Sequence, residues 1–327
     1  MKRKGTTRRP AERARSAANE RFRSIVVPID LTPTSDRVVR RLSMLPLDDA
    51  ATVTLLHVVP SSLPPAERRR AVRDAGRALA EEERHLRALL PRSVRIERQV
   101  TPGGAAREIG ACALRAKAEL IVMGRGGGRA LREAFLGSTA ERVIRKARLP
   151  VLVVGRPPRS PYRRPALALD RDRAANEVVR LMLLLIPPPR PPVSVIHAFG
   201  IPYSSLIYDS LSDEEILEMQ DVFRRRASDE LTELLEAGLA GANAAAAAAP
   251  SWKIHVRYGS PRVVVGNVIR NIDADLLMLG TRGYSGAAYA FVGTVAGDLL
   301  RKADCDVVVV PPRHSRTSRR RSLQAGA

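Results

Sequence analysis

Residues 118–154, AELIVMGRGGGRALREAFLGSTAERVIRKARLPVLVV, contain the pattern that decides the fold, and residues 274–310, ADLLMLGTRGYSGAAYAFVGTVAGDLLRKADCDVVVV, repeat it. In each stretch a short apolar run is followed by a glycine-rich segment, an amphipathic helical pattern and a β-branched run. Apolar runs of this kind predict strands that are buried on both faces of a parallel sheet. The two stretches therefore predict two copies of one strand–loop–helix–strand unit.

The repeat extends toward the N-terminus of each stretch. Two pairs of residues are 140 positions apart, and three pairs of glycines are 156 apart: Asp30 and Asp170, His57 and His197, then Gly103 and Gly259, Gly124 and Gly280, Gly137 and Gly293. Two constant offsets separated by one insertion indicate that a whole domain was duplicated. We expect the insertion to lie within Phe199–Ser212 and Ala237–Ala249 of the second copy.

Each copy alternates short strand patterns with longer helical ones, which is typical of α/β folds with a parallel sheet. The expected strands are 24–29, 52–58, 94–100, 119–123 and 150–154, then 165–169, 193–198, 252–258, 275–279 and 306–310. The expected helices are 35–44, 65–90, 104–116 and 137–147, then 172–186, 212–240, 260–271 and 293–302. The predicted fold class is α/β, with two tandem doubly wound five-stranded parallel-sheet domains of Rossmann-like type.

The charge is distributed unevenly between these domains and the rest of the chain. The formal net charge is +21, but residues 1–24 contribute +7, the end from Pro311 contributes +5, and the Pro/Arg-rich joint Arg156–Pro165 contributes +4. Only +5 remains for everything else. We therefore predict a basic disordered tail at 1–21, domains at 22–155 and 163–311, a linker at 156–162, and a second basic disordered tail at 312–327.

Composition excludes several classes of protein. A hydrophobic content of 45% is typical of globular proteins and excludes collagen-like and fully disordered chains. Cys112 and Cys305 lie far apart, so we predict no disulfide framework and no metal site, and interpret both as inert buried thiols. The longest apolar stretch near a helix, Leu181–Ile186, is too short to span a bilayer, and no apolar segment follows the basic N-terminus. These features favour a reducing, cytoplasmic location and no membrane span.

Both glycine segments follow the pattern G-2x-G-9x-G-[ST], directly after a buried strand. Glycine allows the backbone to approach a ligand closely, and the last Gly-[ST] begins a helix whose free N–H groups and positive dipole end face the same cleft. This arrangement suits a phosphate group. It is neither a P-loop nor a G-x-G-x-x-G dinucleotide loop. The alternative is that each segment is only a tight turn.

Other polar residues near these loops have more than one reading each. Asp30 and Asp170 end the first strand of each copy, where they could accept hydrogen bonds from a ligand, hold a metal beside phosphates, or cap the following helix. Arg125, Arg129 and Arg282 could reach phosphates or be solvated loop charges. His57 and His197 could be acid–base groups, but we favour packing at strand ends. His85, His255 and His314 form no ligand cluster in the sequence.

At the level of whole domains, the two copies resemble tandem universal stress protein domains of the bacterial UspA family, within the adenine nucleotide alpha hydrolase-like superfamily. The resemblance covers about residues 22–155 and 163–311, and the double glycine pattern is typical of the ATP-binding branch. It implies that the glycine loop and Ser/Thr hold ribose and phosphates, that the first-strand Asp contacts the nucleoside, and that backbone just past the second-strand His contacts adenine. It also implies that the two copies pair along their last strands.

The residues that the resemblance assigns to nucleotide binding in the first copy are Pro28, Asp30, Val58, Gly124, Gly127, Gly137 and Ser138; those in the second copy are Asp170, Ala198, Gly280, Gly283, Gly293 and Thr294. The second copy departs from the first at Ala168, where the first has Pro28, and at Ala198, where the first has Val58. Its insertion after His197 lies near the mouth of the site, so we expect the first site to be the more typical one.

The resemblance predicts a universal stress protein that binds ATP, alone or with Mg²⁺, and acts as a regulatory sensor in the stress response. We find no catalytic residues, so slow ATP hydrolysis or autophosphorylation is the most enzymatic activity that we expect. One alternative is non-specific binding of nucleic acid or an anionic surface by the Arg-rich tails. Another is an ATP-using enzyme of the wider superfamily. Association of two chains into a homodimer is left open.

Overall fold

The structure is a computed structural model, and it describes residues 21–32, 35–126, 136–170, 174–201, 211–242, 249–281 and 294–311. The first half contains β1 (Phe22–Pro28), α2 (Ser35–Leu42), β2 (Leu47–Pro60), α3 (Pro65–Leu89), β3 (Arg95–Gly103), α4 (Ala105–Arg115), β4 (Leu120–Gly124), α5 (Ser138–Lys146) and β5 (Val151–Val154). The second half contains β6 (Pro165–Ala168), α6 (Ala175–Leu185), β7 (Val193–Phe199), α8 (Asp213–Gly241), β8 (Trp252–Tyr258), α9 (Pro261–Asn271), β9 (Leu276–Gly280), α10 (Thr294–Lys302) and β10 (Asp306–Val310).

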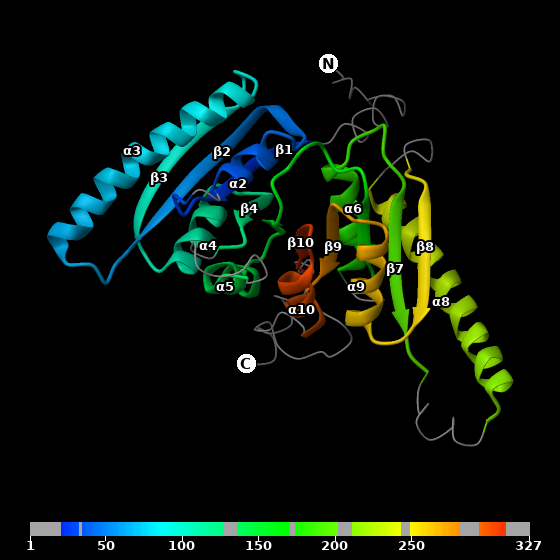
Figure 1. Ribbon diagram of the computed structural model, residues 1–327. Coiled ribbons are helices and arrows are strands. Elements are labelled where there is room, and N and C mark those ends of the chain that lie inside the picture. Colours follow the sequence, from blue (N-terminus) through cyan, green and yellow to red (C-terminus); the bar gives the residue numbers. More distant parts are fainter. Residues whose placement is uncertain are drawn as a thin grey trace, which may run out of the picture.

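The ten strands form one sheet in the order β3-β2-β1-β4-β5-β10-β9-β6-β7-β8. Within each half the strands are parallel and the order is that of a doubly wound domain. The halves meet where β5 and β10 pair antiparallel, with Val153 opposite Val307 and Val151 opposite Val309. The predicted fold class and the pairing of the two copies along their last strands are therefore confirmed. Figure 1 shows the two halves side by side, with α3 and α8 at opposite ends.

Two hydrophobic clusters cover the two faces of this sheet. Successive residues of β1 alternate between them, since Ile25 and Val27 belong to one cluster and Val26 belongs to the other. The first cluster contains side chains of α2, α3, α6 and α8, and the second contains side chains of α4, α5, α9 and α10. Both clusters include residues of both halves, so the junction between the domains is part of the core.

The observed elements differ from the expected ones mainly at their ends. The expected strand 52–58 begins at Leu47 instead, because Leu47 pairs with Phe22 across a register shift in β1. The sequence pattern did not predict this extension, because it contains Asp48 and Asp49, and aspartate is a poor strand former. Helix α8 begins with a capping box between Ser212 and Glu215. Among the described residues, no helix is long and apolar enough to cross a membrane.

The Pro/Arg-rich joint is packed, although its composition is that of an unstructured segment. Tyr162 is 7% exposed and belongs to the first hydrophobic cluster, and Pro158 is also buried. The Tyr162 ring thus anchors the joint in the core. Composition alone does not reveal where that ring packs. The predicted tails at 1–21 and 312–327 lie outside the described residues, except for Arg21.

Candidate functional site

A cavity of about 440 Å³ opens at the carboxyl ends of β1 and β4, where the strand order of the first domain reverses. Ligand crevices of doubly wound sheets form at this point. The cavity is bordered by α2 and α4 and by the first turn of α5. Six of the seven residues predicted for the first copy line it: Pro28, Asp30, Val58, Gly124, Gly137 and Ser138. The seventh, Gly127, lies outside the described residues.

Glycine is required at two positions of the cavity wall. A Cβ on Gly137 would lie 3.0 Å from the carbonyl oxygen of Arg125 and 3.2 Å from the Cα of Gly126, and the Gly137 N–H donates a 2.6 Å hydrogen bond to that carbonyl. Gly126 has φ +70°, which favours glycine. A Cβ on Gly124 would make only ordinary contacts, the nearest with Val38 Cγ2 at 3.6 Å. The spacing pattern missed Gly126, although it lies within the glycine run.

Helix α5 presents its N-terminus to the cavity. Gly137 precedes the helix with extended backbone and, having no side chain, leaves the first turn without an N-cap hydrogen bond from that position. The N–H groups of Ser138 and Thr139, both of which line the cavity, lie at the positive end of the helix dipole. This end of the cavity is therefore suited to an anionic group, as predicted from the Gly-Ser pair.

Asp30 stabilises the turn that leads into α2 and also lines the cavity, so its contact with a ligand stays a prediction. Its Oδ1 accepts hydrogen bonds from the Thr32 N–H at 3.1 Å, the Thr32 hydroxyl at 2.7 Å and the Ser35 hydroxyl at 3.1 Å, so it organises the turn into α2. Its carboxylate is also exposed and lines the cavity. A residue that holds the turn can thus present the same carboxylate to a ligand.

His57 packs at the end of β2, as we favoured from the sequence. Its Nδ1–H donates to the carbonyl oxygen of Ile29 at 2.7 Å, and His197 makes the matching bond to Leu169 at 2.9 Å. Each bond ties the second strand to the residue that precedes the first-strand aspartate. The same hydrogen bond thus occurs in both domains, and it fixes where the chain leaves the sheet before Asp30 and Asp170.

Arg125 has neither of the two roles that the sequence suggested. Its guanidinium crosses the junction, where Nη2 donates to the carbonyl oxygens of Ala303 and, at 3.0 Å, Cys305. Burial lowers the pKa of Arg125, and the nearby carboxylates of Asp304 and Asp306 oppose this shift. The side chain is therefore neither a phosphate ligand nor a solvated loop charge. Arg129 and Arg282 lie outside the described residues.

The second copy reproduces the backbone frame of the site. Asp170 is exposed after a buried Leu169, as Asp30 is after Ile29, and β9 ends at Gly280 with the same burial pattern as β4. Ala198 packs against the second hydrophobic cluster, as Val58 does. Thr294 begins α10, whereas Gly283 and Gly293 lie outside the described residues.

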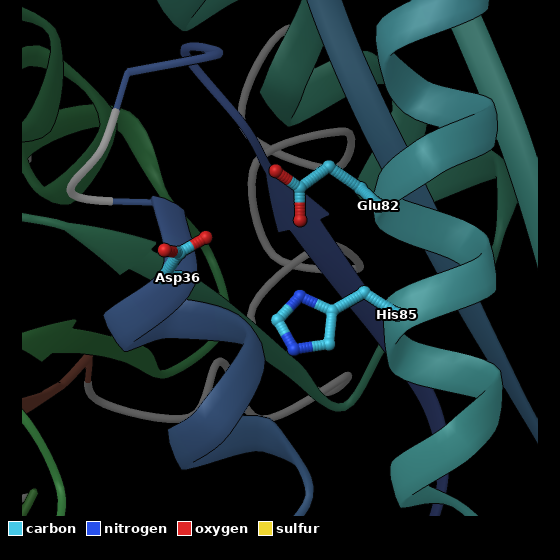
Figure 2. A group of neighbouring side chains, drawn as sticks. All are labelled: Asp36, Glu82 and His85. Carbon is cyan, nitrogen blue, oxygen red and sulfur yellow. The ribbon is translucent and has the colours of Figure 1, made fainter.

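His85 has ligand-type neighbours that the sequence did not indicate. One atom each of Asp36, Glu82 and His85 lie within 4.8 Å of one another, between α2 and α3 (Figure 2). Burial raises the pKa of Glu82, and Asp36 raises it further, whereas His85 lowers it. The spacing Glu82-x-x-His85 could have identified two of the three residues. Because Asp36 and His85 are exposed, the group forms an open set of ligands rather than a preformed metal cage.

The two cysteines are buried, free thiols, as predicted. Cys112 and Cys305 are each 2% exposed. Burial raises the pKa of Cys112, and it raises the pKa of Cys305 to about 12. Neutral thiols without solvent access are poor nucleophiles, so neither cysteine belongs to the site chemistry.

Comparison with known proteins agrees with the observed fold. The profile of the Universal stress protein family matches residues 21–155 and again residues 161–311. A universal stress protein of Synechocystis is 26% identical over 150 residues, which is 46% of this chain and 97% of that protein. The crystal structure of a universal stress protein from Archaeoglobus fulgidus superposes with a TM-score of 0.62 at 17% identity, over 88% of this chain and 96% of that one.

A second solved structure, a putative universal stress protein from Pseudomonas aeruginosa, has a TM-score of 0.55 at 17% identity and covers 91% of this chain and 95% of its own. These similarities to structures concern the fold alone. The two profile matches, in contrast, span most of the sequence and coincide with the two halves of the sheet. The chain therefore belongs to the universal stress protein family and contains two copies of its domain in tandem.

Proposed function

We propose that the first domain binds an adenine nucleotide, ATP in particular, in the cavity between β1, β4 and α5, and that the protein acts as a nucleotide-dependent regulator in the stress response. The observation that carries the proposal is the convergence of Asp30, Gly124, Gly137 and Ser138 on one cavity. These residues come from three segments of the chain, and each offers a group that a nucleotide requires.

The dimensions and the chemistry of the cavity support this ligand. A volume of about 440 Å³ lies within the usual range for small-molecule sites, roughly 300–1,000 Å³. Gly137 leaves room that a Cβ would fill, beside the N-terminus of α5. Phosphate oxygens would accept hydrogen bonds from the N–H groups of Ser138 and Thr139.

The remaining groups are arranged for the nucleoside. Asp30 would accept hydrogen bonds from ribose hydroxyls, and the backbone at Val58, with Ile109 and Met123 beside it, would form the adenine end. If Mg²⁺ accompanies the nucleotide, phosphate oxygens and a carboxylate such as that of Asp30 are the ligands it prefers. Asp170, Ala198, Gly280 and Thr294 would form the corresponding site of the second domain.

Isothermal titration calorimetry of the full chain with ATP tests this function. Gly124→Val places a branched side chain in the first cavity and should weaken binding at that site by more than about tenfold, since methyl groups would displace the ligand. Gly280→Val should do the same at the second site. Gly76→Ala is the matched control, because a Cβ there meets nothing within 4 Å. Absence of binding by the wild type, or unchanged binding by the double valine variant, would refute the proposal.

A further inference from the structure

Residues 303–306 of the second domain run from the end of α10 to the first residue of β10. Two arginines of the first domain, one in α2 and one directly after β4, form hydrogen bonds with this segment. Arg125 donates to the carbonyl oxygens of Ala303 and Cys305, and Arg41 Nε donates to Asp306 Oδ2 at 2.7 Å. Arg41 and Asp306 are both buried, at 5% and 1% exposure. We call residues 303–306 the junction segment.

Arg41 and Asp306 form the centre of a buried polar group. Arg41 Nη1 donates to the Ser160 carbonyl at 3.0 Å, and its guanidinium lies 4.1 Å from the centre of the Tyr162 ring. The Tyr162 hydroxyl donates to Asp306 Oδ2 at 2.8 Å, and the Gly155 N–H donates to Oδ1 at 2.8 Å. Asp306 thus accepts three hydrogen bonds, and Arg41 and Tyr162 contact both Asp306 and each other.

Neither arginine lines the candidate nucleotide cavity, but each belongs to a segment whose other residues do. Arg41 is in the last turn of α2, whose first residue, Ser35, lines the cavity and donates to Asp30. Arg125 directly follows Gly124, and its own carbonyl accepts the 2.6 Å hydrogen bond from Gly137. The junction segment therefore holds the helix on one side of the cavity and the glycine loop on the other.

The duplicated positions carry different residues, so the two positions of the second copy that correspond to Arg41 and Arg125 hold no arginine. With the offsets of 156 and 140, the second copy has Thr281 in place of Arg125 and Leu181 in place of Arg41. The first copy has Pro150 in place of Asp306. Thr281 and Leu181 cannot make charged contacts, and Leu181 is buried in the hydrophobic core. The contacts of Arg41 and Arg125 with the junction segment are thus a specific feature of the first domain and not a consequence of pairing two similar copies.

We propose that Arg125 and Arg41 are positioning residues through which the second domain preorganises the first cavity, so that ligand binding there and docking of the junction segment stabilise each other. The coupling rests on the proposed function for its ligand, but the preorganisation concerns the ligand-free protein. Thermodynamic linkage makes the effect reciprocal: a ligand that binds this cavity more tightly when the junction segment is docked must also stabilise the docked segment.

Cys305 reports on the junction, because its thiol is buried and its pKa is about 12, so alkylation requires local opening. In the full chain, the alkylation rates of Cys305 and Cys112 are measured by mass spectrometry with and without ATP. We expect ATP to slow Cys305 labelling by about 5- to 150-fold, the usual range of coupling. Gly124→Val should abolish this protection, whereas Gly76→Ala, where the added Cβ meets nothing within 4 Å, should preserve it.

Arg125→Met tests the contact between Arg125 and the junction segment, because the substitution keeps a long side chain and removes the guanidinium. We expect the protection of Cys305 by ATP to fall below about twofold, while the alkylation rate of Cys112, in the first domain, stays as it is in the wild type. Arg125→Lys should restore part of the protection of Cys305 by ATP. Arg156→Met is the matched control, because the ion pairs of its guanidinium with described residues at the same junction are longer and exposed: Asp273 at 3.6 Å and Asp304 at 3.8 Å.

A ligand-free measurement separates this proposal from the proposed function. Hydrogen exchange of the wild type and Arg125→Met should show faster exchange at residues 136–140 in the variant, since the loop has lost its anchor. If calorimetry detects no ATP binding, the proposed function fails and this exchange result alone decides the preorganisation. Unchanged exchange at 136–140, or Cys305 protection that persists in Gly124→Val, would overturn the role assigned to Arg125.

Discussion

His57 Nδ1 lies 2.7 Å from the carbonyl oxygen of Ile29, and the same bond, His197 to Leu169, recurs 140 residues later at 2.9 Å. Each histidine thereby fixes the residue that precedes an aspartate of a candidate site. Because the imidazole N–H satisfies a strand-end carbonyl, its other nitrogen is the unprotonated one in the neutral ring. The duplicated bond is therefore part of the frame that places Asp30 and Asp170.

We predict that His57→Ala lowers the free energy of unfolding by about 1 kcal/mol, the usual net value of one hydrogen bond, and weakens ATP binding at the first site because Asp30 is less well placed. Denaturation by urea, followed by circular dichroism, and calorimetry measure the two effects. His197→Ala is the matched control, with a similar loss of stability and unchanged affinity at the first site. If the wild type and His57→Ala bind ATP at the first site with equal affinity, His57 has no role in positioning Asp30.

Gly137→Ala should weaken ATP binding, because the added methyl lies 3.0 Å from the Arg125 carbonyl and must displace the glycine loop. Gly110→Ala, in the middle of α4, adds a methyl with nothing within 4 Å and should instead stabilise the protein by about 0.5–1 kcal/mol. Calorimetry and thermal unfolding of the two variants distinguish them. If both behave alike, the close approach at Gly137 has no role in binding.

Glu82 gives the protein a pH dependence whose sign follows from its raised pKa. Burial and Asp36 disfavour the charged carboxylate in the folded state, so the folded chain holds the proton more tightly than the unfolded chain, where the pKa is about 4.3. The charged group therefore costs stability as the pH rises from about 4.3 through the folded pKa, and the whole cost is present above it.

Glu82→Gln should consequently be more stable than the wild type at pH 7, and the difference should shrink as the pH is lowered toward about 4, near the unfolded pKa. Urea denaturation at a series of pH values measures this. Glu81→Gln, which removes the same charge from an exposed side chain next to it that pairs with Arg84, is the control and should show no such gain. A Glu82→Gln variant that is less stable at pH 7 would contradict the expected sign.

Deletion of residues 1–20 and 312–327 should abolish retention on immobilised DNA at low salt while ATP binding is preserved. The deleted segments contain seven and five Lys/Arg residues, and binding through such charges falls steeply with salt. The N-terminal deletion stops before Phe22, which is buried in β1. Retention by the truncated protein would assign nucleic-acid binding to the folded domains instead.

Most elements of the fold could be predicted from the sequence because their signals are local. The apolar runs Val151–Val154 and Val307–Val310 became β5 and β10, and Pro65 marked the start of α3. The glycine spacing found Gly124, Gly137 and Ser138 of the cavity wall in the same way. Gly126 escaped it because a regular spacing does not show which glycine of a run adopts positive φ.

The sequence by itself determined the duplication, the strand and helix pattern, and which residues end the strands at the candidate sites. Hydrophobic periodicity depends on neighbouring residues, and the constant offsets follow from comparing the sequence with itself. Only the tertiary structure decided where long side chains go. Arg41 and Asp306 are 265 residues apart, and Arg125 lies 180 residues from Cys305, yet the antiparallel pairing of β5 with β10 brings all four together. Asp36 meets Glu82 and His85 in the same way, because contacts between distant segments depend on strand order and helix packing, which no local pattern encodes.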